Sequence, residues 1–104
     1  MSQLTHLAFF RARAGQTQAL GAALSDLVEP TRREAECINY DLHQSAEDID
    51  VWFVHENWRS LGGLDTHMKT AHVQAFLEVA PALVDGAIEL RRFTMTSMPA
   101  APRG

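Results

Sequence analysis

The stretch VWFVHENWRSLGGLDTHMKTAHVQAF, residues 51–76, decides the fold, because within it an apolar strand pattern passes into a helical pattern that carries two histidines. Along 51–58, residues two apart share one face of a strand, and large apolar groups occur on both faces. Such a strand is typical of burial on both sides. From residue 61 apolar residues recur at helical spacing with His67 in their stripe, and His72 begins a second helical run. We therefore expect polar side chains to converge where the strand meets these helices.

The flanking segments complete the order of elements. We expect strands at 4–13, 37–45, 51–58 and 87–98, and helical segments at 17–35, 61–71 and 72–84. Pro30 lies inside the first helical pattern and predicts a kink or a restart there. In the second strand, Ile38, Tyr40 and Leu42 alternate against a polar face, and residues 46–50 suit a hairpin to the third. This order predicts an α+β fold of the ferredoxin-like β-α-β-β-α-β type, a four-stranded antiparallel sheet with helices on one face.

The uncovered face of that sheet has a consequence for assembly. The first and third strands are apolar on both faces, so a monomer would expose a large hydrophobic patch on the side without helices. We therefore expect a homodimer in which two sheets pack face to face around a two-fold axis. The domain is expected to span residues 4–96, with 97–104 as a C-terminal tail.

Length, charge and cysteine content exclude several classes of protein. A chain of 104 residues has room for one domain. The net charge is −4 and basic residues cluster only as two arginine pairs, so we expect neither nucleic acid nor an anionic membrane as partner. No stretch approaches the about 18 apolar residues of a spanning helix, so the protein is expected to be soluble and cytoplasmic. The single cysteine, Cys37, excludes an internal disulfide and a CxxC motif, and we expect it to be a small buried side chain.

Four segments of the chain carry a family resemblance. They are FRARAG (10–15), EPTRREAECINYDLH (29–43), HENW (55–58) and DTHMKTAHVQAF (65–76). Through them the chain, from about Leu4 to Thr94, resembles the antibiotic biosynthesis monooxygenase domain family, small dimeric α+β barrels that include quinol monooxygenases. The resemblance implies a cofactor-free oxygenase that acts on a small aromatic substrate with dioxygen. The chain departs from the family pattern at two positions: Glu36 stands where glycine is usual, and Ala71 stands where proline is usual. We expect these two departures to affect the shape of the pocket edge.

By position, the resemblance also implies which residues form the site. The positions that the family pattern marks are Cys37, Tyr40, Glu56, Trp58, His67 and His72. We expect His67 and His72 to be catalytic, and we expect the substrate to be bound by Glu56, Trp58, Tyr40 and the aromatic Phe76. The haem-degrading branch of the family uses a first-strand asparagine and a tryptophan near the place of His67. Neither is present, so no haem is expected.

Each candidate also has a structural interpretation. His67 lies on the inward stripe, which suits a base or a substrate-orienting group. The alternative is that His67 is a core histidine bonded to a backbone carbonyl. His72 could simply occupy a first helical turn. Glu56 on a buried strand must be paired, and we expect an arginine partner. We expect the aromatic residues to lie mainly in the core or the dimer interface, with one or two of them in the pocket. The remaining histidines are expected at the surface or in the interface: His6, His43 and His55.

The chemistry needs little from the protein. A quinol or phenol must be held in an apolar pocket, deprotonated and given access to dioxygen. A histidine with a pKa near ~6.5 is about 3.5 units below a phenol near ~10, so the pocket must stabilise the phenolate. Arg91 or Arg92, hydroxyls and the helix start before His72 are candidates for that role. No metal is expected, because His67 and His72 are five residues apart, which is not the spacing of one helical face, and no HExxH motif occurs.

Three functions from different classes are compatible with the sequence. The first is the cofactor-independent monooxygenase, which consumes oxygen without flavin, haem or metal. The second is an isomerase-like enzyme acting on a small oxygenated metabolite, of the kind found in autoinducer-2 breakdown. The third is a dimeric module that binds a hydrophobic small molecule without converting it. We favour the monooxygenase, because the resemblance is strongest there and aromatic residues outnumber phosphate-binding residues in the central stretch.

Overall fold

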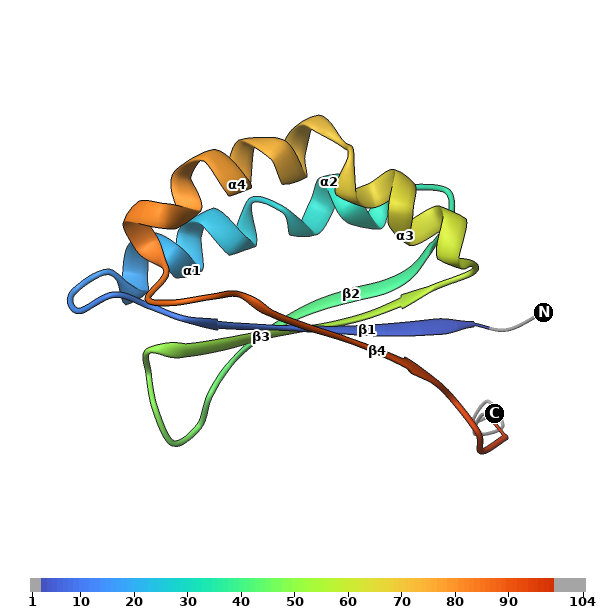
Figure 1. Cartoon of the computed structure of the whole chain (residues 1–104), viewed down its shortest axis with the longest axis horizontal. Coiled ribbons are helices and arrows are strands. Elements are labelled where there is room, and N and C mark those ends of the chain that lie inside the picture. The colour runs from blue at the N-terminus through green and yellow to red at the C-terminus, as the bar shows by residue number, and fades with distance from the viewer. Residues whose placement is uncertain (1–2, 99–104) are drawn as a thin grey trace.

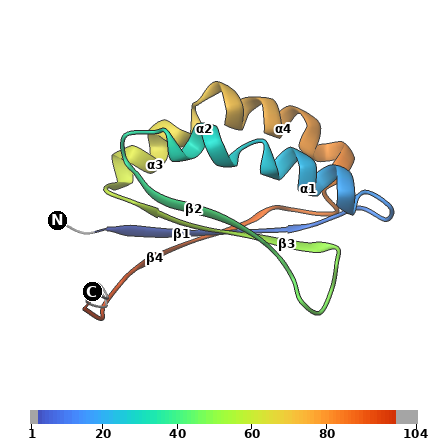
Figure 2. The ribbon, with the colours of Figure 1, turned by 180° about the vertical axis from the view of Figure 1, so that it is seen from behind.

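The strands and helices form two layers, a sheet and a set of helices on one of its faces. The computed structural model describes residues 3–98. Its elements are β1 (Leu4–Arg11), α1 (Thr17–Ser25), α2 (Val28–Arg32), β2 (Cys37–Gln44), β3 (Val51–Trp58), α3 (Leu61–Met68), α4 (Ala71–Leu83) and β4 (Glu89–Thr94). The sheet has the order β2-β3-β1-β4, and all its neighbours are antiparallel. All four helices lie on the same face (Figure 1), and the view from behind shows the other face free of helices (Figure 2). The expected ferredoxin-like α+β fold is confirmed.

Both helical regions are broken in two. The first breaks before Val28, and Pro30 lies in the first turn of α2, where its missing N–H has no intrahelical partner to lose. The expected restart is therefore confirmed. The second region breaks between α3 and α4 at Lys69 and Thr70. In the part of the chain that the structure describes, no helix is long and apolar enough to cross a membrane.

The core lies between the sheet and the helices. On β3, Val54, Glu56 and Trp58 face the helices and are at most 3% exposed. The opposite face of the sheet carries half-buried aromatic side chains instead. Phe9 and Phe53, paired across β1 and β3, stack with their ring centroids 4.9 Å apart. The apolar uncovered face that the sequence predicts is therefore present.

Three details of the strands differ from expectation. β1 ends at Arg11, and the next residue, Ala12, forms an isolated bridge with Val84 after α4. β4 ends at Thr94, which pairs with Leu4, the first residue of β1, and within residues 3–98 no strand continues the pairing beyond it. In β2 a register shift between Cys37 and Asn39 turns Ile38 outward, 43% exposed. The expectation that Ile38 shares the buried face of Tyr40 is wrong, because period-two counting fails across a bulge.

Two further expectations concern the ends of elements. Leu61 is 51% exposed although it begins the apolar stripe of α3, because it lies in the first turn of the helix, beyond the core. Of the expected tail, residues 97 and 98 follow β4, whereas 99–104 lie outside the described residues.

Candidate functional site

A cavity of about 230 Å³ lies between the helix-facing side of the sheet and helices α3 and α4. Most of its lining is apolar, and the polar side chains that line it are His6, Tyr40, Glu56 and His67. Four of the six site residues expected from the sequence therefore line one cavity: Tyr40, Glu56, His67 and Phe76. A larger groove of about 450 Å³ beside the end of α4 is lined by no histidine or carboxylate. The cavity therefore combines an apolar lining with groups that can carry out acid-base chemistry.

Strand register places polar residues in a row across the floor of the cavity. Tyr40 on β2 pairs with Glu56 on β3, Glu56 pairs with His6 on β1, and His6 pairs with Arg92 on β4. Directly paired residues point to the same face of a sheet. Arg92 is therefore on the helix-facing side, at the exposed edge, whereas Arg91 pairs with Leu7 on the other side.

The position of His6 corrects a sequence expectation. We expected His6 at the surface or in an interface, but it is buried, at 3% exposure. Its place in β1 explains this, because Ala8 and Phe10, two and four residues later, are buried on the same face. His43 and His55 lie instead on the face without helices, close to Phe53.

Glu56 is buried between two donors. Its Oε2 lies 3.1 Å from Nδ1 of His6, and its Oε1 accepts a hydrogen bond of 2.8 Å from Nε1 of Trp58. The expected arginine partner is wrong, because the nearest side chain in the strand register is His6. Since an ionised carboxylate only accepts hydrogen bonds, Nδ1 of His6 donates, and Nε2 of the neutral ring is left as an acceptor. Trp58 itself is fully buried and packs against His67, with ring centroids 4.7 Å apart, rather than lining the cavity.

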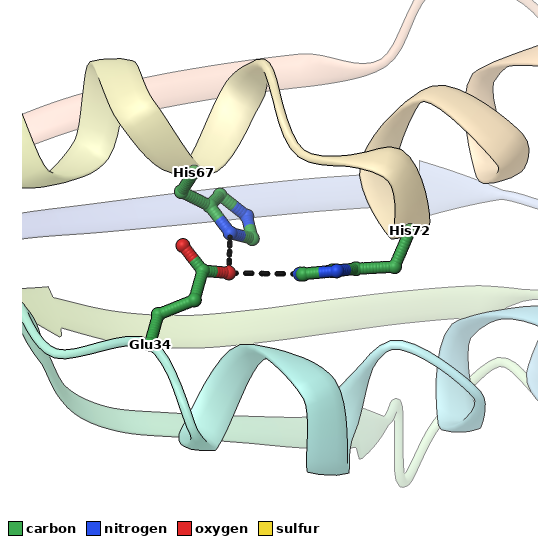
Figure 3. Close-up of side chains that lie close together, drawn as sticks. All are labelled: Glu34, His67 and His72. Atoms are coloured by element: carbon green, nitrogen blue, oxygen red, sulfur yellow. Dashed lines mark hydrogen bonds and ion pairs between the residues drawn. The ribbon is translucent and has the colours of Figure 1, made fainter.

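A second carboxylate, Glu34, joins the two histidines (Figure 3). Its Oε2 lies 2.8 Å from Nδ1 of His67 and 2.8 Å from Nε2 of His72. His67 is 3% exposed and lines the cavity, whereas His72 lies on the other side of the carboxylate, in a surface groove of about 210 Å³. The sequence did not single out Glu34, because it stands in a run of charged residues that reads as a solvated turn. Its partners are 33 and 38 residues away.

Local hydrogen bonds place these three side chains. The turn after α2 is held by Glu34 itself, whose N–H donates to the carbonyl of Thr31 and whose carbonyl accepts from Cys37. At the break between α3 and α4, the hydroxyl of Thr70 donates to the carbonyl of His67 and accepts from the N–H of Val73. Thr70 is therefore the N-cap of α4 and also ties it to the last turn of α3.

This break corrects the argument that His67 and His72 cannot converge. On one continuous helix, two side chains five residues apart do not lie on the same face and cannot meet. Here His67 ends α3 and His72 begins α4, so the helical spacing does not apply across the break. Both rings point to the same carboxylate oxygen.

The hydrogen bond to Glu34 determines which nitrogen of His67 can act. Because the carboxylate accepts, Nδ1 carries a proton, and Nε2 of the neutral ring is an acceptor. Among residues 3–98, Nε2 has no hydrogen-bond partner, and the ring lines the cavity. Trp58 and Tyr40 pack around the ring and restrict its orientation. The arrangement can accept a proton from a molecule bound in the cavity.

Tyr40 is expected to stay protonated well above the ordinary pKa of a phenol. Burial, with the charge of Glu56 adding to it, raises the pKa of Tyr40 far above about 10. Since the folded chain then holds the proton more tightly than the unfolded chain, the free energy of unfolding falls as the pH rises above about 10. Tyr40 is the single tyrosine of the chain, so absorbance at the tyrosinate band reports on it alone. We expect no tyrosinate at pH 10.5 in folded protein and ionisation near pH 10 in urea. Equal titration of both states would contradict this.

Cys37 contributes packing rather than nucleophilic chemistry. It is partly buried and packs against the core. Burial, followed by the negative charge of Glu34, raises the pKa of its thiol to about 11. The thiolate is the reactive form of cysteine, so Cys37 is inert at neutral pH.

Comparison with known proteins shows the family of this chain. The family model described as antibiotic biosynthesis monooxygenase matches residues 4–79. The chain is 35% identical to "Putative monooxygenase Rv0793" of Mycobacterium tuberculosis over 71 residues, which are 68% of this chain and 69% of that protein. It is also 30% identical to "Uncharacterized protein sll1783" of Synechocystis over 64 residues, 62% of this chain but only 44% of that protein.

Solved structures show the same likeness over nearly the whole chain. The crystal structure of PA3566 from Pseudomonas aeruginosa is similar with a TM-score of 0.89 at 32% identity, covering 93% of this chain and 97% of that one. The structure of Rv0793 has a TM-score of 0.89 at 26% identity, covering 95% and 100%. The family match spans more than half of the residues and includes most of those that line the cavity, from His6 to Leu77, with Ile88 and Leu90 beyond it. The chain belongs to the antibiotic biosynthesis monooxygenase family.

Proposed function

We propose that this protein is a cofactor-independent monooxygenase that oxidises a quinol or a related small aromatic molecule with dioxygen. The observation that carries the proposal is the pair of Glu34 and His67 at an otherwise mostly apolar cavity. A histidine that is held by a carboxylate through Nδ1, with its ring in the wall of a binding cavity and Nε2 free to accept, has the arrangement of a general base. The apolar lining, with Phe10 and Phe76 in edge contact, suits an aromatic ring.

In this mechanism Nε2 of His67 takes the phenolic proton of the bound quinol. The resulting anion is electron-rich and passes electrons to dioxygen. One oxygen atom bonds to a ring carbon that loses its hydrogen, and the other leaves as water, so a quinol and dioxygen give a hydroxyquinone and water. The substrate supplies all four electrons, and no other reductant is required.

The protein must overcome the difference between the two pKa values. At about 3.5 units, the gap between a histidine and a phenol corresponds to about 4.8 kcal/mol. The carboxylate of Glu34 stabilises the imidazolium that forms, because it lies 2.8 Å from Nδ1. The protonated hydroxyl of Tyr40, raised in pKa by burial, is a donor on the cavity wall for a substrate oxygen.

The experiment that tests this function is oxygen uptake by chelator-treated protein with reduced naphthoquinols and anthrones. A reaction without protein is the control, since these substrates oxidise spontaneously. Protein-dependent uptake with formation of one product and no hydrogen peroxide supports monooxygenation. Uptake at the control rate across the panel, with saturable binding of the same compounds, would instead favour a binding module.

A second candidate is supported by the second histidine and carboxylate pair. Two histidine and carboxylate pairs line or adjoin the cavity: His6 with Glu56, and His67 with Glu34. An isomerase that moves a proton needs one group to remove it and another to return it, and the two pairs could fill these roles. Such an enzyme would convert a small oxygenated metabolite without consuming oxygen. Turnover under nitrogen therefore distinguishes it from the monooxygenase.

We also propose that the active form is a cytoplasmic homodimer that works on small molecules, without nucleic acid or membrane partners. The support for the dimer is the face of the sheet without helices, which carries Leu7, Phe9 and Phe53, all half-buried. Aromatic side chains on an uncovered sheet face are a suitable dimer contact. The net charge of −4 and the lone cysteine suit the cytoplasm and argue against polyanionic partners.

Replacing Phe53 with glutamate is expected to abolish the dimer, because it would bury a charge in an apolar interface. Light scattering after gel filtration at micromolar concentration should give twice 11.6 kDa for the unchanged protein and 11.6 kDa for the variant. Leu61→Glu, at an exposed position on the helix layer, is the control and should leave the mass unchanged. A monomeric parent protein would overturn the proposal.

A further inference from the structure

The cluster of Glu34, His67 and His72 has more donor groups than a general base requires. One carboxylate holds two imidazole rings, yet the proposed reaction uses only His67. The three donor atoms, Oε2 of Glu34, Nδ1 of His67 and Nε2 of His72, all lie within 4.8 Å of one another. They come from the turn after α2, the end of α3 and the start of α4 (Figure 3).

This donor set matches the chemistry of divalent transition metals. Two imidazole nitrogens and one carboxylate oxygen form the ligand set of many zinc sites, in which water takes a fourth position. With bonds of about 2.0–2.1 Å, a tetrahedral ion needs donor atoms about 3.4 Å apart. The distances from Oε2 of Glu34 to the two histidine nitrogens, 2.8 Å each, would have to lengthen by about half an ångström. The two nitrogens, at most 4.8 Å apart, would have to come to about 3.4 Å from each other. These are side-chain movements.

The cluster is open to solvent on the side away from the cavity. The side chains of Glu34 and His72 are 15% and 22% exposed. Glu34 lines a groove of about 510 Å³, together with Ser60, Thr66 and Thr70. An ion can therefore reach the donors, and a water ligand has room, without passing through the substrate cavity.

We propose that Glu34, His67 and His72 form a binding site for a divalent transition metal ion, for which Zn²⁺ is the reference, and that the bound ion inhibits the enzyme. The second part rests on the proposed function. Without metal, Nδ1 of His67 carries the proton and donates to Glu34, and Nε2 is the free acceptor that serves as base. A metal ion on Nδ1 displaces that proton to water, and Nε2 takes up a proton from water in exchange, so the neutral ring carries its single proton on Nε2. His67 then presents a donor instead of an acceptor to the cavity, and Glu34 is no longer free to stabilise an imidazolium.

The test measures binding and inhibition separately. Chelator-treated protein is titrated with Co²⁺, whose visible absorption reports low-coordinate nitrogen and oxygen ligation, and with Zn²⁺ by calorimetry and thermal unfolding. His72→Gln removes one ligand and keeps the hydrogen bond between Glu34 and His67. We expect it to weaken Zn²⁺ binding by at least about tenfold and to remove the rise in melting temperature, as loss of a supporting group at metal sites does. Glu78→Gln, at an exposed carboxylate on α4 outside the cluster, is the matched control and should bind as the parent does.

The inhibition arm follows oxygen uptake as Zn²⁺ is added, each protein compared with its own metal-free rate. Uptake by the parent should fall in step with occupancy, and His72→Gln should need at least about tenfold more Zn²⁺ for the same fractional loss. The ¹⁵N shifts of the His67 ring should show Nε2 change from acceptor to N–H on Zn²⁺ binding, a readout that needs no turnover. Binding that His72→Gln leaves unchanged would overturn the site. Full occupancy with undiminished uptake, or with Nε2 still an acceptor, would overturn the inhibition. Absence of uptake in every protein would count against the proposed function alone.

Discussion

His67→Gln is expected to lower kcat for oxygen uptake by about 10²–10⁴-fold, the contribution typical of a positioned general base. Glutamine has a similar reach and can still bond to Glu34, but its amide cannot take up a proton. KM should change little, because the apolar lining that binds the aromatic ring is unaltered. The measurement is initial oxygen uptake over a range of quinol concentrations, with the rate without protein subtracted.

Two further variants give this prediction its control. Glu78→Gln changes an exposed carboxylate on α4, away from the cavity and from the sheet face without helices, and should keep the parent rate. Glu34→Gln keeps the size of the side chain but removes the charge that stabilises the imidazolium, so kcat should fall by an intermediate amount. A His67→Gln variant that is folded by circular dichroism and works within twofold of the parent would rule out His67 as the base.

Glu56→Leu is expected to lower the free energy of unfolding by about 3 kcal/mol, because it leaves two buried donors without an acceptor at about 1–3 kcal/mol each. The donors are Nδ1–H of His6 and Nε1–H of Trp58, both on residues at most 3% exposed. At about 4–8 °C per kcal/mol for a domain of about this size, the melting temperature should fall by more than ten degrees. Urea unfolding followed by tryptophan fluorescence measures the free energy directly.

The matched variant is Glu56→Gln. Its amide oxygen can accept from Trp58, and its NH₂ group can donate to Nδ1 of His6 once that ring takes its other tautomer. Both bonds are then retained in neutral form, and the loss should stay below about 1 kcal/mol. Equal losses for leucine and glutamine would mean that the charge of Glu56, rather than the satisfaction of its two donors, stabilises the fold.

The pattern of apolar residues was sufficient for the architecture. Periods of two and of about 3.6 residues depend only on neighbours in the chain, so the strand 51–58, the helix break near Pro30 and the hairpin at 46–50 were predictable. The inward position of His67 followed from the same stripe, and the structure buries it in the cavity wall. The family resemblance rested on local motifs and needed no tertiary contact either.

The partners of the polar residues could not be predicted in this way. Glu56 bonds to His6, 50 residues away, and Glu34 bonds to His67 and His72, 33 and 38 residues away. Which side chains meet depends on strand register, and register is set jointly by the whole sheet. The bulge at Ile38 is a further case, since one extra residue reverses the alternation on which the prediction depends.

Local periodicity therefore determined the elements, their order and, apart from the bulge at Ile38, their buried faces, because each of these depends on residues close together in the chain. The tertiary structure alone decided that His6 is buried beside Glu56, that Glu34 serves two histidines, and that a helix break brings His67 and His72 to one oxygen. The physical reason is that a buried polar group must find a partner, and the nearest available partner is determined by how the elements pack rather than by their sequence.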